Sequence, residues 1–250
     1  MPDKKTRVKK ETSSEKKAAR KLVMDLHIHT LYSIDSESEL HEIIDTAKER
    51  EIDVLGITDH NTVEGALHMK RIAPDGITVL LGQEVKTTEG EIIVYGLEET
   101  LPKKKELLET CRMAKERGGF IIIPHPFDRM RSGIGNRMLD ILNYIDAVEV
   151  FNAHNRLGHF NNKARAFAEK HGLPMVAGSD SHSYEEIGFT TNTVVAEPEE
   201  KSILNAIKSG NSVMVAKKSG FKYNIKLGII KLKKKRQLRK LKKLRASASC

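Results

Sequence analysis

Histidines and carboxylates recur in this chain just after short apolar segments. An imidazole or a carboxylate follows at least six of these segments, and the set is His27, His29, His60, Glu84, His125, His154, Asp180 and His182. Imidazole nitrogens and carboxylate oxygens are the ligands that divalent transition metals take in proteins. The residue types therefore predict a metal site, provided that the fold brings the ends of these segments together.

Each of these signals is weak when it is taken alone. The pair His27 and His29 is separated by two positions, so both rings face one side of a strand and can reach one metal. Asp59-His60 could equally form a helix cap, and Pro124-His125-Pro126 could be only a rigid turn. The prediction rests on the repeated placement at segment ends.

The elements that would position these residues alternate along the chain. Apolar β-type runs are expected at 22–27, 54–58, 78–84, 92–95, 120–123, 147–151, 174–177 and 193–196, with a hairpin turn at 89–91. Helical patterns are expected at 39–50, 62–72, 104–117, 138–143, 161–171 and 199–209. This alternation indicates an α/β fold with a parallel sheet, and six or seven units favour a closed TIM-like barrel over an open sheet. The carboxyl ends of barrel strands converge on one face, where active sites are built.

Charge divides the chain of 250 residues into three parts. The net charge of +9 is the sum of +6 over residues 1–21, −13 over 22–200 and +16 over 201–250. We expect a disordered basic segment at 1–21, the enzyme domain at 22–216 and a basic tail at 217–250. The two cysteines, Cys111 and Cys250, form no disulfide or zinc motif, and this favours a cytoplasmic setting. No apolar run is long enough to cross a bilayer, so we expect no membrane span.

The basic tail has three interpretations. It can be a solvated polycation, a tether that binds nucleic acid without sequence preference, or, least favoured, a helix on an anionic membrane. Residues 221–232 could form a short strand, and Leu238, Leu241 and Leu244 recur at helical spacing. Aromatic residues for base stacking are scarce there.

Taken together, the motifs resemble the polymerase and histidinol phosphatase (PHP) family across about residues 22–200. The matching segments, in chain order, are Asp25–Thr30 (DLHIHT) with Tyr32-Ser33, Gly56–Thr62 (GITDHNT), Gly82–Glu84 (GQE), Pro124–Pro126 (PHP), Glu149–Asn152 (EVFN) and Gly178–His182 (GSDSH). The resemblance implies a distorted (β/α)7 barrel that holds two or three divalent ions, of manganese, zinc or iron.

The resemblance also implies a role for each ligand. The first metal would be held by His27, His29, Glu84 and Asp180, and Glu84 would bridge to a second metal that is also held by His125 and His154. The third would be held by Asp35, His60 and His182. Asn152 competes with His154 for the place on the fifth strand.

The implied function is metal-dependent hydrolysis of phosphate esters. The substrates would be mono- or diesters of nucleotides, short oligonucleotides or a phosphorylated metabolite, attacked by a water that the metals activate. Arg129, Arg131 and Arg156 are candidates for substrate contacts, because arginine pairs well with phosphate. The alternative is a non-catalytic, nucleic-acid-binding barrel subunit that uses the basic tail. The sequence does not indicate an oligomeric state.

Overall fold

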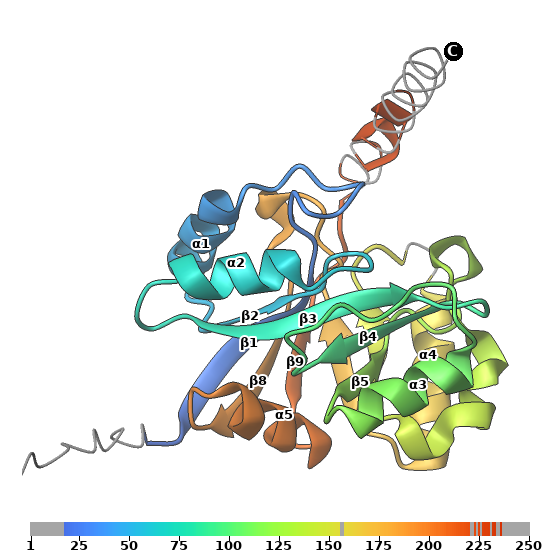
Figure 1. Ribbon diagram of the computed structural model, residues 1–250. Helices are drawn as coiled ribbons and strands as arrows, with labels where there is room; N and C mark the ends of the chain where they lie inside the picture. The colour runs from blue at the N-terminus through green and yellow to red at the C-terminus, as the bar shows by residue number, and fades with distance from the viewer. Residues whose placement is uncertain are drawn as a thin grey trace, which may run out of the picture.

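The apolar runs of the sequence form one mixed sheet (Figure 1). The computed structural model describes residues 18–155, 158–220 and the positions 223, 225, 227–230, 232, 233 and 236. The strands are β1 (Arg20–Ile28), β2 (Val54–Ile57), β3 (Thr78–Lys86), β4 (Glu91–Tyr95), β5 (Phe120–Ile123), β6 (Ala147–Asn152), β7 (Met175–Gly178), β8 (Thr190–Ala196) and β9 (Val213–Ala216). Their order in the sheet is β7-β6-β5-β4-β3-β2-β1-β8-β9.

The sheet closes on itself between β1 and the segment that follows β7. The backbone N–H of His29 donates to the carbonyl of Ser181 at 2.9 Å, and the N–H of Ser181 donates to the carbonyl of His27 at 3.1 Å. Further along, the buried side chain of Asn192 on β8 closes the gap to β7. Its amide accepts from the N–H of Ala177 at 2.8 Å and donates to the carbonyl of the same residue at 2.7 Å, as a neighbouring strand would. The expected α/β fold with a distorted TIM-like barrel is confirmed.

Several strand pairs of the barrel wall are antiparallel, although the alternation of strands and helices indicated a mainly parallel sheet. The β3–β4 hairpin was predicted, and β4 pairs antiparallel with both β3 and β5 inside the barrel wall. The strand β8 runs antiparallel to β1, and β9, which was not predicted, runs antiparallel to β8. The expectation of a parallel sheet was therefore wrong for β8, whereas the antiparallel pairing of β3 with β4 agrees with the predicted hairpin.

Helices cover the outside of the barrel in two groups. The α-helices are α1 (Leu40–Glu49), α2 (Glu64–Ile72), α3 (Leu107–Glu116), α4 (His159–His171) and α5 (Glu200–Lys208), and the 3-10 segments are η1 (Arg129–Arg131), η2 (Gly135–Tyr144) and η3 (Tyr184–Glu186). In Figure 1, α1 and α2 flank one side of the sheet and α3 and α4 the other, while α5 lies at the end opposite α1. The segment predicted as a helix at 138–143 is part of the 3-10 segment η2.

Three apolar clusters hold these layers together. One draws on strands β1 to β8 and on α5, and it includes Leu22, Met24 and Tyr95. A second packs α1 and α2 against β1 to β3, and a third packs α3, η2 and α4 against β3 to β6. Each cluster follows the alternation of a strand or the stripe of a helix, which is how the sequence indicated them.

The ends of the described chain differ from the expectation in two places. Arg20 and Lys21, expected in the N-terminal segment, belong to β1. The described positions from Tyr223 to Arg236 are helical, so the short strand expected at 221–232 is wrong. Residues 1–17 and the leucines at 238, 241 and 244 lie outside the described residues. Among the described helices, none has the length and apolar character that crossing a bilayer requires.

Candidate metal centre

A bulge in β1 delivers the first two histidines to the centre of the barrel face. Asp25 pairs with Leu55 and Ile28 pairs with Ile57, so three positions of β1 span two of β2. Bulges of this kind re-aim side chains next to active sites. His27 and His29 are both fully buried, and their Nε2 atoms lie 3.2 Å apart. Two lone-pair nitrogens at this distance repel each other unless a proton or a cation lies between them or beside them.

Glu84 lies at the centre of the site, between four imidazoles. Its Oε1 is 3.1 Å from Nε2 of His125 and 3.8 Å from Nε2 of His27. Its Oε2 is 2.9 Å from Nδ1 of His60 and 3.5 Å from Nε2 of His29. Each carboxylate oxygen therefore faces its own pair of imidazoles. This is the arrangement expected of a carboxylate that bridges two cations.

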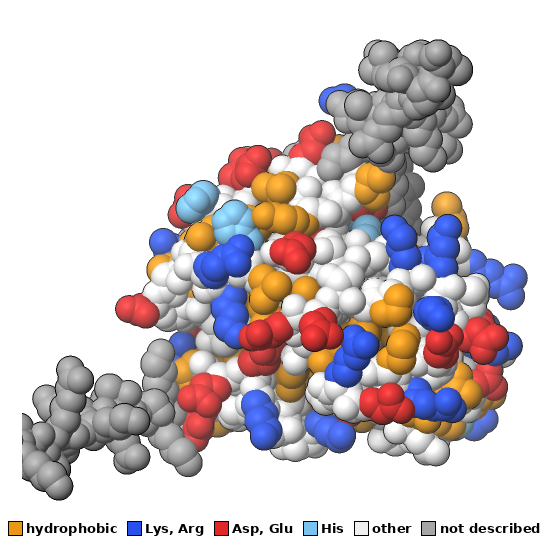
Figure 2. Space-filling model, in the orientation of Figure 1, with side chains coloured by type: hydrophobic (Ala, Val, Ile, Leu, Met, Phe, Trp, Pro, Cys, Tyr) orange, Lys and Arg blue, Asp and Glu red, His pale blue; other side chains and the backbone are white. Residues whose placement is uncertain are grey.

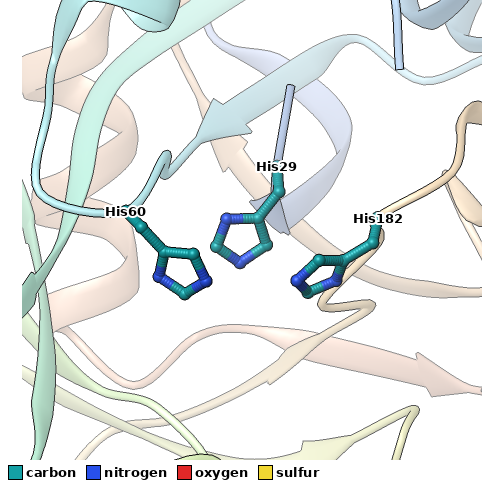
Figure 3. Close-up of side chains that lie close together, drawn as sticks. All are labelled: His29, His60 and His182. Carbon is teal, nitrogen blue, oxygen red and sulfur yellow. The ribbon is translucent and has the colours of Figure 1, made fainter. Parts of the chain in front are cut away.

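Ligand atoms gather into three groups among the described residues. The groups are His27, His29 and Glu84; His29, His60 and His182; and Glu84, Glu91 and His125, and within each the ligand atoms lie within 4.8 Å of one another. Figure 3 shows the second group, with the ring of His29 between the other two. The ring centroid of His29 is 4.4 Å from that of His60 and 4.3 Å from that of His182.

Asp35 and Asp180 supply carboxylates to these groups. Oδ2 of Asp35 is 3.3 Å from Nε2 of His60 and 3.4 Å from Nε2 of His182. Oδ1 of Asp180 is 3.4 Å from Nε2 of His29 and 3.6 Å from Nε2 of His27. The structure thus brings Asp35 to the third predicted group and Asp180 to the first.

Two of these residues have a backbone conformation that L-residues rarely adopt. His125 has a φ of 30° and Asp180 a φ of 53°. Such conformations cost free energy and are found where a site must hold a side chain in place. Both side chains are directed by this backbone toward Glu84 and His29, respectively.

The ionisation of the site reflects the crowding of these groups. Burial and the neighbouring His182 and His60 lower the pKa of His29 to about 3, so its ring is neutral and has a lone pair available. Burial acts to lower the pKa of His60, but the charges of Glu84 and Asp35 outweigh it and raise that pKa well above the ordinary value. Burial acts to raise the pKa of Glu84, but the surrounding histidines hold it well below the ordinary value. The carboxylates therefore remain ionised and need positive charge beside them.

A buried glutamate on β6 holds the first histidine from behind. Oε1 of Glu149 is 2.9 Å from Nδ1 of His27, and its Oε2 accepts from the N–H of His125 at 2.7 Å and from Nδ2 of Asn152 at 2.9 Å. A carboxylate on the far nitrogen of a metal-binding histidine fixes the tautomer and the direction of its ring. Glu149 lies in a matched motif, but the sequence analysis gave it no role. The feature that could have indicated a role for Glu149 is its acidic side chain inside the apolar run 147–151.

Glu91 also joins the site and was missed. It pairs with Lys86 across the β3–β4 hairpin, and Glu84 lies two positions before Lys86 on β3. Residues two apart on a strand, and residues directly opposite on the partner, share one face. The sequence analysis placed Glu91 in the hairpin turn at 89–91, and only the register of the paired strands brings it beside Glu84.

The loops around the site are held by Asp59, which follows β2. Its carboxylate accepts from the N–H and the hydroxyl of Thr30, both at 2.7 Å, and from the hydroxyl of Ser33 at 2.7 Å. The hydroxyl of Ser33 in turn accepts from the N–H of His60 at 3.0 Å. Asp59 therefore positions His60 through Ser33 and caps no helix.

His154 lies apart from the group around Glu84. Its Nε2 is 2.9 Å from Oε1 of Glu186, and its ring centroid is 6.0 Å from that of His182. It belongs to none of the three groups of ligand atoms. Asn152, the competing residue on this strand, donates to Asp180 at 3.3 Å and to Glu149.

Of the three arginines predicted to contact substrate, the two that the structure describes have different locations relative to the site. Arg131 lines a cavity of about 300 Å³ with the candidate metal ligands, and its Nη1 forms an ion pair with Oδ2 of Asp180. Arg129 faces a different cavity on the other side of the same turn. Arg156 lies outside the described residues. Among the described arginine candidates, Arg131 is therefore the one that the structure brings to the candidate metal ligands.

The residues fit divalent cations well. The imidazoles and carboxylates are buried and converge from different strands, and the buried Nδ1 of His125 has no hydrogen-bond partner among the described residues. Buried polar atoms normally have partners. A mixed set of carboxylates and imidazoles is the donor set that manganese, zinc or iron takes.

Known proteins are similar to this chain in sequence and in fold. A probable phosphatase of Enterobacter sp. (strain 638) is 32% identical over 219 residues, which cover 73% of this chain and 89% of that protein. An uncharacterized protein of Methanocaldococcus jannaschii is 42% identical over 151 residues, covering 56% of this chain and 87% of that protein. A family model described as PHP-associated matches residues 158–212.

A solved structure extends the likeness over most of the fold. It is a two-domain protein of Bacteroides vulgatus, described as containing a predicted PHP-like metal-dependent phosphoesterase, and it superposes with a TM-score of 0.69 at 18% identity. The likeness covers 85% of this chain and 70% of that one. With the relatives above and with the motifs on the strand ends, these findings show that the chain belongs to the PHP family.

Proposed function

We propose that this protein is a metal-dependent hydrolase of phosphate esters. The observation that carries the proposal is Glu84, whose two carboxylate oxygens face separate pairs of imidazoles. A bridging carboxylate is what a site needs to hold two cations close together, and paired cations are typical of phosphoester hydrolysis.

Within this site the cations would be held by residues already described. His27, His29, Glu84 and Asp180 would hold one, and Glu84 with His125 and Glu91 a second. The third would be held by Asp35, His60 and His182. Divalent ions so held supply a hydroxide nucleophile near neutral pH and offset the charge that develops on the phosphoryl oxygens.

The protein's own side chains would do the rest. Glu149 would keep the ring of His27 in one orientation, and Asp59 would hold the loop that carries His60. Arg131 lines the cavity and would pair with a non-bridging phosphoryl oxygen once Asp180 is neutralised by a cation. Lys86 lines the same cavity, although its ammonium lies 3.4 Å from Glu91.

The names of similar proteins support the same chemistry. One relative is named a probable phosphatase, and one protein of similar fold is described as containing a phosphoesterase. Manganese is the first ion to test, followed by zinc and iron, because all three suit mixed imidazole and carboxylate sites.

The test is hydrolysis of p-nitrophenyl phosphate and of bis(p-nitrophenyl) phosphate by chelator-treated protein, before and after addition of Mn²⁺, Zn²⁺, Fe²⁺ or Mg²⁺. We expect turnover that depends on added metal, and the preferred ester distinguishes a phosphatase from a phosphodiesterase. A protein that binds no metal and hydrolyses neither ester would contradict the proposal. The basic tail and a nucleic-acid-binding role would then be the explanation to pursue.

A further inference from the structure

A second cavity lies next to the metal-binding cavity, on the other side of one turn. This flanking cavity has a volume of about 480 Å³, and it is lined by Phe127, Arg129, Met130, Arg137, Phe160 and Lys163, among others. Both cavities are lined by Met130, whose side chain is 95% exposed. The two spaces therefore open on either side of a single exposed side chain.

The wall between the two cavities is built rigidly from the loop that carries His125. The N–H of Asp128 donates to the carbonyl of His125 at 3.0 Å, and the N–H of Met130 donates to Oδ1 of Asp128 at 3.0 Å. A Cβ on Gly133 would lie 2.5 Å from the carbonyl oxygens of both His125 and Pro126, so the loop is packed closely there. A ligand in the flanking cavity would thus be held at a fixed position relative to His125.

The flanking cavity is positively charged, although the body of the protein is acidic. Its lining contains three basic side chains and no carboxylate. Arg137 is balanced by Asp140, whose carboxylate lies 2.8 Å from its Nε. Within the described part of the chain, Arg129 and Lys163 form no ion pair, and both are exposed. These two charges are available to an anion, and Figure 2 shows Lys and Arg side chains gathered beside a surface histidine at the upper right of the molecule.

Aromatic rings accompany these charges. The ammonium of Lys163 lies 5.0 Å from the centroid of the Phe127 ring, which contacts Phe167 edge-on. Phe160 lines the cavity and packs against His159, with ring centroids 3.9 Å apart. Basic side chains that alternate with aromatic rings suit a nucleotide, because the phosphate pairs with the cations and the base stacks on a ring. The volume is also in the range of small-molecule sites.

We propose that the flanking cavity binds the nucleotide next to the scissile phosphodiester, so that the substrate is a single-stranded oligonucleotide. The phosphate of that nucleotide would lie between Arg129 and Lys163, and its base would lie against Phe160. This inference rests on the proposed phosphoesterase function and narrows its substrate class. A small phosphorylated metabolite would occupy the metal-binding cavity alone and would leave the flanking cavity without a role.

The test compares two esters in the manganese-loaded full-length protein. The variants are Arg129→Ala, Lys163→Ala, the double variant and Phe160→Ala. Arg71→Ala and Lys48→Ala, exposed on α2 and α1, are the matched controls. We expect the double variant to lose about tenfold or more in kcat/KM on a labelled five-residue oligothymidylate, because both charge-assisted contacts to the phosphate are lost. On bis(p-nitrophenyl) phosphate it should stay within about twofold of wild type. An equal loss on both esters, or no loss on the oligonucleotide, would overturn the proposal.

Binding in the presence of a chelator separates this proposal from the proposed function. The fluorescence anisotropy of the same labelled oligonucleotide is measured over a series of salt concentrations. The double variant should bind more weakly, and its slope of log affinity against log salt should be smaller by about 0.7, which corresponds to one phosphate of a single strand that is no longer neutralised. The basic tail is present in every variant, so it contributes equally. Unchanged affinity and slope would overturn the flanking-site proposal. If the double variant binds more weakly but no protein, wild type included, hydrolyses an ester, the flanking cavity still binds the nucleotide and the proposed phosphoesterase function is wrong.

Discussion

The carboxylate of Glu149 lies 2.9 Å from Nδ1 of His27, while Nε2 of the same ring faces Glu84 and Asp180. One buried carboxylate thus holds the histidine from the side opposite the other two. Burial acts to lower the pKa of His27, but the charges of Asp180 and Glu149 outweigh this effect, and the pKa lies well above its ordinary value. Glu149 is therefore a positioning residue that would act on the metals through His27 and through the backbone of His125.

Substitution of Glu149 tests this relationship. Glu149→Gln should weaken the affinity for manganese by about 10- to 100-fold, because the neutral amide no longer fixes the ring and its basicity. The measurement is isothermal titration of the chelator-treated protein with Mn²⁺, and Glu169→Gln, exposed on α4, is the control. Wild-type affinity in Glu149→Gln would show that His27 needs no such support.

Arg131 should be needed for the substrate and not for the metals. In the structure its guanidinium pairs with Asp180, and together with the nearby histidines it overcomes the effect of burial and holds the pKa of that carboxyl well below the ordinary value. A cation bound to Asp180 would take over this role and leave the guanidinium free for phosphate.

We therefore expect Arg131→Ala to keep its manganese content and to lose about 100-fold in kcat/KM on the preferred p-nitrophenyl ester. Arg117→Ala, exposed and paired with Glu99 on the outside of the barrel, is the control and should retain its activity. Loss of manganese from Arg131→Ala, measured by elemental analysis, would mean that Arg131 acts on the site's structure instead.

Closure of the barrel by Asn192 predicts a cost in stability. Asn192→Ala removes both hydrogen bonds to Ala177 and leaves a buried N–H and carbonyl without partners. The free energy of unfolding should fall by about 2 kcal/mol, at about 1 kcal/mol for each bond. Urea unfolding followed by circular dichroism measures this change, with Asn205→Ala, exposed on α5, as the control. A loss below about 0.5 kcal/mol, the level of a surface substitution, would show that the barrel closes without this side chain.

The buried thiol of Cys111 gives a prediction on reactivity and pH. Burial raises the pKa of Cys111 to about 12, although the nearby Lys115 lowers it slightly. In a Cys250→Ser variant, Ellman's reagent at pH 8 should react with no thiol in the folded state and with one after unfolding in urea.

The raised pKa of Cys111 also determines how the stability of the fold changes with pH. The thiol ionises more easily in the unfolded chain, so its contribution to stability is present below its ordinary pKa and declines as the pH rises toward 12. Rapid reaction of Cys111 in the folded protein at pH 8 would contradict the burial on which both expectations depend.

Much of the site could be predicted because its ligands follow strands that are easy to recognise. His27, Glu84 and His125 come directly after or at the end of apolar runs, and the carboxyl ends of such strands meet on one face of a barrel. The residues that were missed reach the site because of how the strands pair with one another. Glu91 reaches the site through the register of a hairpin, and Glu149 through its position inside a strand, and both require the strands to be paired before their neighbours are known.

The parts of the fold that escaped prediction have the same origin. Local patterns predict that strands exist, but the partner of a strand depends on contacts far away in the sequence. Thus the pairing of β8 with β1 and of β9 with β8 was not predicted. The contact of Asn192 with Ala177 joins β8 to β7 through a side chain, which no strand pattern indicates. His154 followed the rule for strand ends, yet its ring pairs with Glu186, which lies in a 3-10 turn that no sequence pattern indicated.

The most direct measurement of the central claim, that Glu84 bridges the cations of a hydrolytic site, is the metal content and ester hydrolysis of Glu84→Ala beside wild type. Glu98→Ala, exposed at the rim, is the control. The account predicts that wild type and Glu98→Ala retain two or three equivalents of manganese after gel filtration and hydrolyse a p-nitrophenyl ester. It predicts that Glu84→Ala folds with an unchanged circular dichroism spectrum, loses about two equivalents together and shows no turnover. A folded Glu84→Ala protein with full metal content and wild-type turnover would contradict it.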